Sequence, residues 1–200
     1  MADGCISENR VIISLQEEDG YILEKFANYI KINKKIKFLN KQKENWKNKY
    51  VLNFTSKRMV KDLAKYGIIP KKSHFTYFPN IPEKFYSHFI RGVFDGDGCI
   101  SITKDKISFS VIGNIDLIKE IQNKLVTNLN FNKNNLQTSK KNKNIKTISY
   151  SGRLQVLKIY DYLYKDCGDL FLKRKKEKFE SLPQQKTKLN RYRNEKGQFK

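Results

Sequence analysis

Two aspartates stand at matching places in a repeated stretch of the sequence. The letters D-G-C-I-S that begin at Asp3 return at Asp97, 94 residues further on. Each copy is followed by an alternating, strand-like segment and then by a charged amphipathic segment. A duplicated unit with one carboxylate per copy can bring the two acids together across a pseudo-twofold axis. Such a pair supplies hard oxygen ligands, which suit Mg²⁺ better than softer metals.

The second copy carries a longer motif, because residues 90–98 read I-R-G-V-F-D-G-D-G. Gly92 and Gly96 are four residues apart, the spacing of small residues where two helices cross closely. The motif resembles the signature of the LAGLIDADG homing endonucleases, of which the first copy keeps only the last letters. A D-G-D-G sequence alone also occurs in calcium loops and turns. The resemblance assigns metal binding to the last acid, Asp97, and to Asp3, whereas Asp95 also fits a helix cap or turn.

The composition indicates a nucleic-acid partner. Lys and Arg number 41 against 20 Asp and Glu, which gives a net charge of +21 and a pI of about 9.8. Such a charge is typical of proteins that neutralise phosphates. A merely basic surface, as in ribosomal proteins, is the plain alternative. A membrane surface is less favoured, because the lysines are spread along the chain.

The compartment is expected to be reducing and soluble. Three cysteines without C-x-x-C spacing argue against a zinc site and a disulfide framework. No apolar run approaches the roughly 18 to 20 residues of a membrane span, and no signal peptide opens the chain. The Lys, Asn and Ile excess is typical of AT-rich coding sequences, so we expect a bacterial or phage-host cytoplasm or an organelle matrix.

The periodicity predicts an α+β fold built twice. Strand, strand, helix, strand, strand, helix is expected over residues 1–67, and the same order after a further helix over 83–182. Proline-containing residues 68–82 are predicted to link the units, and residues 183–200 to form a basic tail. The expected hairpin strands include 35–42 with 46–55, and Leu170 to Leu182 is expected to form a basic helix. The resemblance implies two αββαββα repeats whose antiparallel sheets form a DNA-binding saddle.

The resemblance also implies an activity and its residues. A monomer of this kind would cleave both strands of a long, asymmetric DNA site with Mg²⁺. Gln16 matches a polar residue that closes the second strand in the family, and its partner in unit two is expected near Ile112 or Gly113, a departure that predicts an asymmetric site. Lys57 and Arg153 match a basic residue near the last strand-to-helix junction, although simple phosphate contacts explain them equally well.

Polar residues on the solvent-facing sides of the sheets are predicted to contact DNA. Trp46 could stack in a groove, but the core is the favoured place for it. The predicted DNA-binding residues are Asn9, Arg10, Lys37, Asn40, Gln42 and Lys49 in unit one, and Thr103, Lys104, Lys106, Gln137, Ser139, Lys140, Lys143 and Lys146 in unit two.

A full first signature would extend about two helical turns ahead of Ala2. The resemblance therefore predicts a first motif that is truncated at the N-terminus, and it leaves open an impaired or degenerate activity. The rival functions on the same scaffold are a DNA-binding protein that does not cleave and an intron RNA maturase. A basic structural RNA-binding protein would not explain the D-G-C-I-S duplication.

Overall fold

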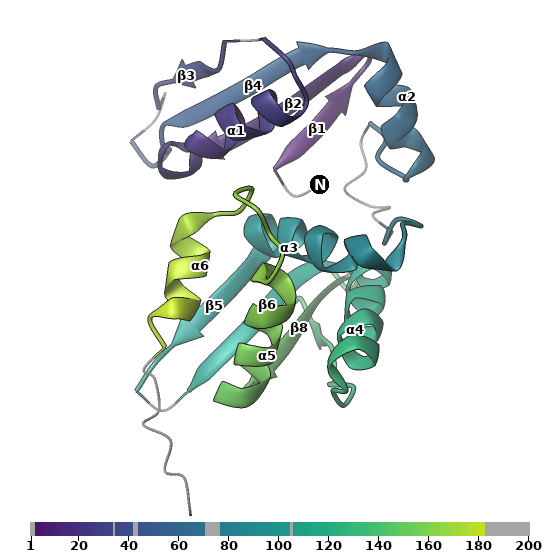
Figure 1. Cartoon of the computed structure of the whole chain (residues 1–200), viewed down its shortest axis with the longest axis vertical. Coiled ribbons are helices and arrows are strands. Elements are labelled where there is room, and N and C mark those ends of the chain that lie inside the picture. Colours follow the sequence, from purple (N-terminus) through teal and green to yellow (C-terminus); the bar gives the residue numbers. More distant parts are fainter. Residues whose placement is uncertain (1–2, 34, 42–43, 71–76, 105, 183–200) are drawn as a thin grey trace, which may run out of the picture.

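The computed structural model describes residues 3–33, 35–41, 44–70, 77–104 and 106–182 (Figure 1). Its first unit is a four-stranded antiparallel sheet in the order β1-β2-β4-β3, with helices on one face. The elements are β1 (Gly4–Ser7), β2 (Arg10–Gln16), the 3-10 helix η1 (Glu17–Asp19), α1 (Tyr21–Tyr29), β3 (Lys37–Leu39), β4 (Lys49–Thr55) and α2 (Lys57–Lys65).

The second unit repeats this order after an additional helix. Its sheet has the order β5-β6-β8-β7 and is again antiparallel. The predicted α+β fold of two repeats is thereby confirmed. The elements are η3 (Glu83–Phe85), α3 (Tyr86–Asp97), β5 (Gly98–Ile102), β6 (Ile107–Asn114), α4 (Ile115–Leu129), β7 (Gln137–Thr138), β8 (Ile145–Ser151), α5 (Arg153–Tyr164) and α6 (Lys173–Glu180).

The strand registers state which residues of the two units are equivalent. Gly4 faces Ile13 in unit one, and Gly98 faces Val111 in unit two. Because Gly4 and Gly98 belong to the repeated D-G-C-I-S letters, equivalent residues of β2 and β6 differ by 98. The partners of Ile13 and Val111 on the next strand are residues 52 and 148, so β4 and β8 differ by 96.

Alternation along the strands builds the two cores. In β6, Phe109 and Val111 are fully buried beneath the helices, while the intervening Ser108 and Ser110 lie on the other face. In β2, Val11 and Leu15 are the buried residues. The core of unit two is larger, because α3 and α6 add side chains to it. Figure 1 shows α4, α5 and α6 across the sheet of unit two and α3 between the two units.

Capping side chains set several boundaries. The Oγ of Ser56 accepts a hydrogen bond from the Met59 amide (3.2 Å), and Gly67 adopts φ +75° just after α2. The strands of the β3–β4 hairpin are shorter than expected. Asn48 ties the connecting loop instead: its Oδ1 accepts from the Lys41 amide (3.0 Å), and its Nδ2 donates to Glu17 (2.9 Å).

The expectations about the C-terminal helix, the tail and the linker are answered only in part. The basic helix near the C-terminus is confined to α6, shorter than the predicted Leu170 to Leu182. The predicted tail and part of the predicted linker fall outside the described residues, and the domain boundaries stay a prediction. Among the described helices, none combines the length and apolarity that crossing a membrane requires.

Candidate functional site

Helix α3 presents two different faces. Ile90, Val93 and Phe94 are buried in the core of unit two. Gly92 and Gly96 face the other way, into a cavity of about 370 Å³ between the units. An added Cβ at Gly92 would meet no atom within 4 Å. In the part of the chain that the structure describes, the glycine pair therefore faces a cavity, and the helix crossing expected there is not formed.

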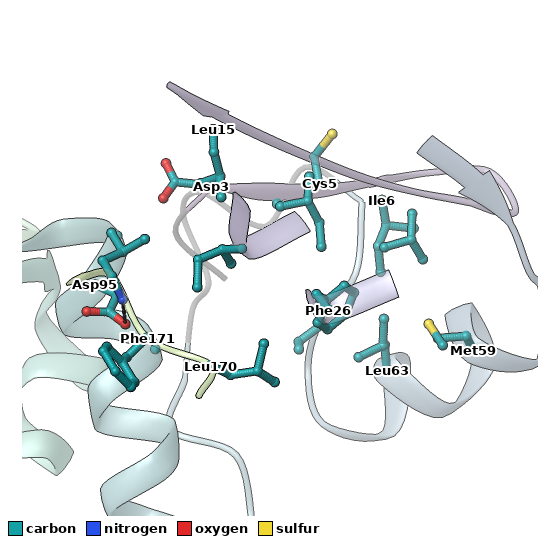
Figure 2. A pocket seen from close by; sticks show the side chains of 18 residues that line it. Asp3, Cys5, Ile6, Leu15, Phe26, Met59, Leu63, Asp95, Leu170 and Phe171 are labelled. Atoms are coloured by element: carbon teal, nitrogen blue, oxygen red, sulfur yellow. Dashed lines mark hydrogen bonds between the residues drawn. The ribbon is translucent and has the colours of Figure 1, made fainter. Parts of the chain in front are cut away.

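The opposite wall of the cavity is apolar and belongs to unit one. Leu15 comes from β2, Phe26 from α1, and Met59 and Leu63 from α2 (Figure 2). The segment before α6 closes one side, where Leu170 and Phe171 point toward the cavity.

Asp95 lines this cavity but is engaged by unit two. Its Oδ2 accepts a hydrogen bond from the Leu172 amide (3.2 Å), and its buried Oδ1 finds no donor among the described residues. Burial raises the pKa of Asp95 to about 6, although Lys175 and Arg91 nearby oppose the shift. The carboxylate thus fixes the segment before α6, in keeping with the structural role that the sequence left open for it.

Asp97 and Asp3 occupy equivalent, exposed places at the entrances of the first strands. Asp97 is the last residue of α3 and directly precedes β5. Asp3 directly precedes β1, and its backbone oxygen accepts from the Ser14 amide (3.1 Å). The internal repeat therefore places one exposed carboxylate at the same corner of each sheet.

Lys175 is a buried cation at this corner that sequence reasoning missed. Its Nζ donates to the backbone oxygens of Phe94 (2.5 Å) and Gly98 (2.7 Å), on either side of Asp97, and the residue is only 6% exposed. Burial lowers the pKa of Lys175 to about 8, while the charges of Asp95 and Asp3 oppose this shift. The carboxylates of Asp95 and Asp3 are therefore within electrostatic range of the Lys175 ammonium group.

A sequence signal for Lys175 did exist. The residue is spaced by three, four and seven positions from the buried Leu172, Phe179 and Leu182, so it lies on the apolar stripe of α6. Its neighbours in the basic run, Lys173 and Arg174, are exposed. A lysine on an apolar stripe needs a buried acceptor, and the junction of α3 and β5 provides two carbonyl groups.

Gln16 does have a polar counterpart in unit two, which corrects the expectation at Ile112 or Gly113. The offset of 98 makes Asn114 its equivalent. Gln16 is exposed, and its Oε1 accepts from the Lys47 ammonium (3.0 Å). Asn114 is buried, and its Oδ1 caps α4 by accepting from the Asp116 amide (2.9 Å). The sequence predicts a strand that ends at Ile112, and Asn114 was missed because β6 continues two residues further.

Lys57 and Arg153 are equivalent, since they differ by 96 and each begins a helix. Lys57 follows Thr55, which pairs with Arg10 at one end of β2, whereas Gln16 is at the other end. Six residues of strand span about 20 Å. The structure therefore does not bring Lys57 beside Gln16, and the same register separates Arg153 from Asn114. A catalytic role for either basic residue stays a prediction.

Most residues predicted to contact DNA are exposed. Four lie on the uncovered sheet faces: Arg10, Lys37 and Lys49 in unit one, and Gln137 in unit two. Ser139 is half-buried, and Gln42 lies outside the described residues. Exposed positions in turns and loops are held by Asn9, Asn40, Thr103, Lys104, Lys106, Lys140 and Lys143.

Two expectations about where these residues lie were wrong, and a DNA contact of Lys146 stays a prediction. Lys146 pairs with Gly113, whose strand position alternates toward the helix-covered face, and its Nζ donates to Thr138 on the edge strand (2.6 Å). Trp46 is not in the core, because it is 53% exposed. Its loop is held away from the core by Asn48.

The donor set fits a cation that shares its ligands with a substrate. Among the described residues, no group of three or more His, Cys, Asp or Glu side chains could hold a metal ion. A Mg²⁺ ion held by the two hard carboxylates of Asp3 and Asp97 would need further oxygen ligands from water and from phosphate groups.

Comparison with known proteins agrees with this architecture. Residues 84–164 match the family model of the LAGLIDADG-like domain, whereas no curated protein matches the sequence. The I-LtrWI LAGLIDADG homing endonuclease bound to target DNA has a similar structure, with a TM-score of 0.57 and 9% identity over 90% of this chain and 84% of that chain. The LAGLIDADG homing endonuclease I-GzeII in complex with its DNA target gives 0.55 and 13%, with the same coverage.

A third similar structure is full-length DUF199/WhiA from Thermatoga maritima, with a TM-score of 0.54 and 12% identity over 90% of this chain and 54% of that chain. At these identities the likeness is one of fold. The fold class is that of two-repeat LAGLIDADG proteins. Residues 84–164 match the LAGLIDADG-like domain and the fold is shared with LAGLIDADG homing endonucleases, so the resemblance seen at residues 90–98 is confirmed.

Proposed function

We propose that this protein is a site-specific endonuclease that hydrolyses both strands of duplex DNA with divalent metal ions at Asp3 and Asp97. The observation that carries the proposal is the equivalence of these two exposed carboxylates, each directly before the first strand of its sheet. A single acid in one unit would be explained by a turn. Asp3 acts electrostatically on the buried Lys175 ammonium, which also binds the backbone on both sides of Asp97, and this favours a shared site.

The surface and charge of the chain support duplex DNA as the substrate. The net charge of +21 suits a partner with many phosphates. Each unit leaves one face of its antiparallel sheet free of helices, and a sheet or ribbon of this kind fits the major groove. The structures of I-LtrWI and I-GzeII, which share the fold, contain target DNA.

Mg²⁺, when bound, would activate a water molecule and stabilise the oxygen that leaves phosphorus. The protein's own part is to hold the ligands still. Lys175 fixes the backbone on both sides of Asp97, and Asp95 is held away by the Leu172 amide. Gln16 lies two residues beyond Ser14, which faces Asp3, so its amide can orient water or phosphate at the same corner.

The test is a cleavage selection with Mg²⁺. A plasmid library with randomised inserts is incubated with the protein, and the newly formed ends are sequenced. We expect enriched insert sequences that are cut by the wild type and by Asp161→Asn, a control at an exposed acid on α5. Asp97→Asn should not cut them. Cleavage by Asp97→Asn at the wild-type rate would refute the metal assignment.

A DNA-binding protein that does not cleave is the second candidate. It is favoured by the lack of a three-ligand cluster among the described residues and by the equal likeness in fold to DUF199/WhiA. Specific binding without any enriched ends would support it. An intron RNA maturase is the third, and a tenfold preference for structured RNA over duplex DNA at matched salt would promote that function.

A further inference from the structure

The uncovered faces of the two sheets carry different chemistry at equivalent positions. The unit-one face, on β1 to β4, presents the exposed Arg10 and Lys49 on neighbouring strands. With offsets of 98 and 96, their equivalents on the unit-two face, on β5 to β8, are Ser108 and Ile145. Both cationic side chains of unit one are thus replaced by uncharged ones.

The edge strands show the same difference. Lys37 faces Val51 in unit one, and Gln137 faces Thr147 in unit two. Val51 and Thr147 differ by 96, so Lys37 and Gln137 are equivalent. The sheet in unit two therefore places an amide where the sheet in unit one places a third cation.

Hydroxyl groups dominate the unit-two face. Ser101 faces Ser108, and Ser108 faces Ser151, so three serines form one row across β5, β6 and β8. The next row continues with Ser110 facing Ser149. Side chains of this size bring the sheet backbone close to any surface that it contacts.

Apolar methyl groups follow the serine rows. Ile112 is 42% exposed and faces Thr147 across the strand pair. Its equivalent in unit one is Ser14, again from the offset of 98. An exposed isoleucine beside a threonine has no charge to satisfy, so its methyl groups suit an apolar contact.

These side chains discriminate bases to different degrees. Arg and Lys donate to O6 and N7 of guanine, and Gln pairs with adenine. A serine hydroxyl rotates freely, donates or accepts, and so bonds to either kind of base pair. Methyl groups such as those of Ile112 and Thr147 contact the methyl group of thymine.

We propose that the two faces read half-sites of different chemistry: a stringent, guanine-containing half by the unit-one face, and a permissive, A·T-rich half by the unit-two face. The inference rests on the proposed function, because it requires binding to duplex DNA. Affinity in the permissive half comes from the exposed loop lysines Lys104, Lys106, Lys140 and Lys143, which meet phosphates without reading sequence.

A binding selection from randomised duplexes tests the proposal. A photo-crosslinking amino acid at Asn9 or at Thr103, in the equivalent β1–β2 and β5–β6 turns, assigns each half of the enriched site to one unit. We expect guanine enriched about tenfold or more at one or more positions of the unit-one half, the discrimination of a bidentate contact. In the unit-two half, guanine enrichment should stay below about threefold, and any preference should be for A·T pairs, most of all at the position that Gln137 contacts.

Substitutions that exchange residues between equivalent positions of the two units provide a stricter test. Arg10→Ser gives unit one the residue of unit two and should abolish the guanine preference at its position. Ser108→Arg should create one in the other half, and Lys49→Ile repeats the test at a fully exposed position. Lys143→Ser should weaken binding to all sequences alike.

Equal enrichment of guanine in both halves, or a stronger enrichment of guanine in the unit-two half, would overturn the proposal while the proposed function stands. Unchanged base preferences in both Arg10→Ser and Lys49→Ile would overturn it as well. No binding to any duplex would overturn the proposed function, and this inference with it.

Discussion

Arg174 of α6 donates two parallel hydrogen bonds to the buried carboxylate of Asp19 in unit one. Its Nε lies 3.0 Å from Oδ1, and its Nη2 lies 2.8 Å from Oδ2. Beside this pair, the Lys173 amide donates to the Tyr21 hydroxyl (2.6 Å), which donates to the Phe171 carbonyl (3.2 Å). The segment from Phe171 to Arg174 therefore fastens unit two to unit one and fixes how the two sheets face each other.

Replacing Arg174 should weaken this connection strongly. Arg174→Leu leaves the Asp19 side chain, which is 5% exposed, as an uncompensated buried charge. We expect a loss of about 2 to 3 kcal/mol in the free energy of unfolding. This is below the loss for a fully buried pair, because the Arg174 side chain is 43% exposed. Urea unfolding measures the change.

The double-mutant cycle supplies the control. Asp19→Asn combined with Arg174→Leu should recover part of the loss, since the orphaned charge is gone. Asp169→Asn, which removes the exposed partner of Lys25, should alter stability little. If Arg174→Leu is no more harmful than Asp169→Asn, the ion pair does not join the units as described.

Lys175 should matter for stability, although it lies in a run of exposed basic residues. Lys175→Met keeps the aliphatic stem but leaves the carbonyl groups of Phe94 and Gly98 without their donor. We expect a loss of about 1 to 2 kcal/mol in thermal or urea unfolding. Lys178→Met, at an exposed position of the same helix, should stay within about 0.5 kcal/mol of the wild type.

The pH dependence of this effect has a definite sign. The folded protein lowers the pKa of Lys175 from 10.5 to about 8, so between these values the unfolded chain binds more protons. The free energy of unfolding of the wild type relative to Lys175→Met should therefore rise from pH 8 to pH 10. A flat difference over this range would mean that the ammonium is not buried.

For Asp95 we expect the opposite trend: its contribution to the free energy of unfolding should fall as the pH rises through the acid range. Its pKa is raised from 3.8 to about 6, so the folded protein binds the additional proton between these values. The stability that protonated Asp95 contributes is present below pH 4 and is lost as the pH rises through 6. Asp95→Asn should therefore gain stability relative to the wild type from pH 4 to pH 6.5, by about 2 to 3 kcal/mol. Unfolding curves across this range provide the measurement, and a constant difference would contradict it.

The repeat and the motif were readable from the sequence because both are local. The alternation of Phe109 and Val111 with serines fixed the faces of β6, and the duplicated letters fixed Asp3 and Asp97 as equivalent. What could not be read depends on contacts between distant segments. The bond from Asn48 to Glu17, in the loop where Trp46 is exposed, is one such contact.

The register of Gln16 illustrates the same limit. A two-residue extension of β6 moved its equivalent to Asn114, because strand ends are set by cross-strand bonds that no local pattern specifies. Lys175 was missed for a related reason. Its apolar spacing in α6 was visible, but its acceptors lie at the junction of α3 and β5, 81 and 77 residues earlier.

Binding to long DNA should weaken steeply with salt. With a net charge of +21 and exposed lysines in the turns of both units, the protein should release many counterions from a duplex. Six or more phosphate contacts correspond to a loss of roughly 10³-fold or more in affinity between 50 and 200 mM salt. Lys104→Gln should reduce the slope of log affinity against log salt by about 0.9. A flat response of the wild type would argue against nucleic acid as the partner.

Asp3 and Asp97 should act as one unit in cleavage. Asp97→Asn and Asp3→Asn each remove one carboxylate from the proposed pair, so each should abolish Mg²⁺-dependent cutting of a selected site. The double variant should be no worse than either single one, because groups that work together do not add their losses. Binding should be kept or tightened in all three, since a negative charge facing phosphate is removed. Gel-shift titration with the selected duplex measures binding, and plasmid linearisation measures cutting. Losses that multiply in the double variant would mean that the two acids act at separate sites, and loss of binding together with cutting would mean that they support the fold.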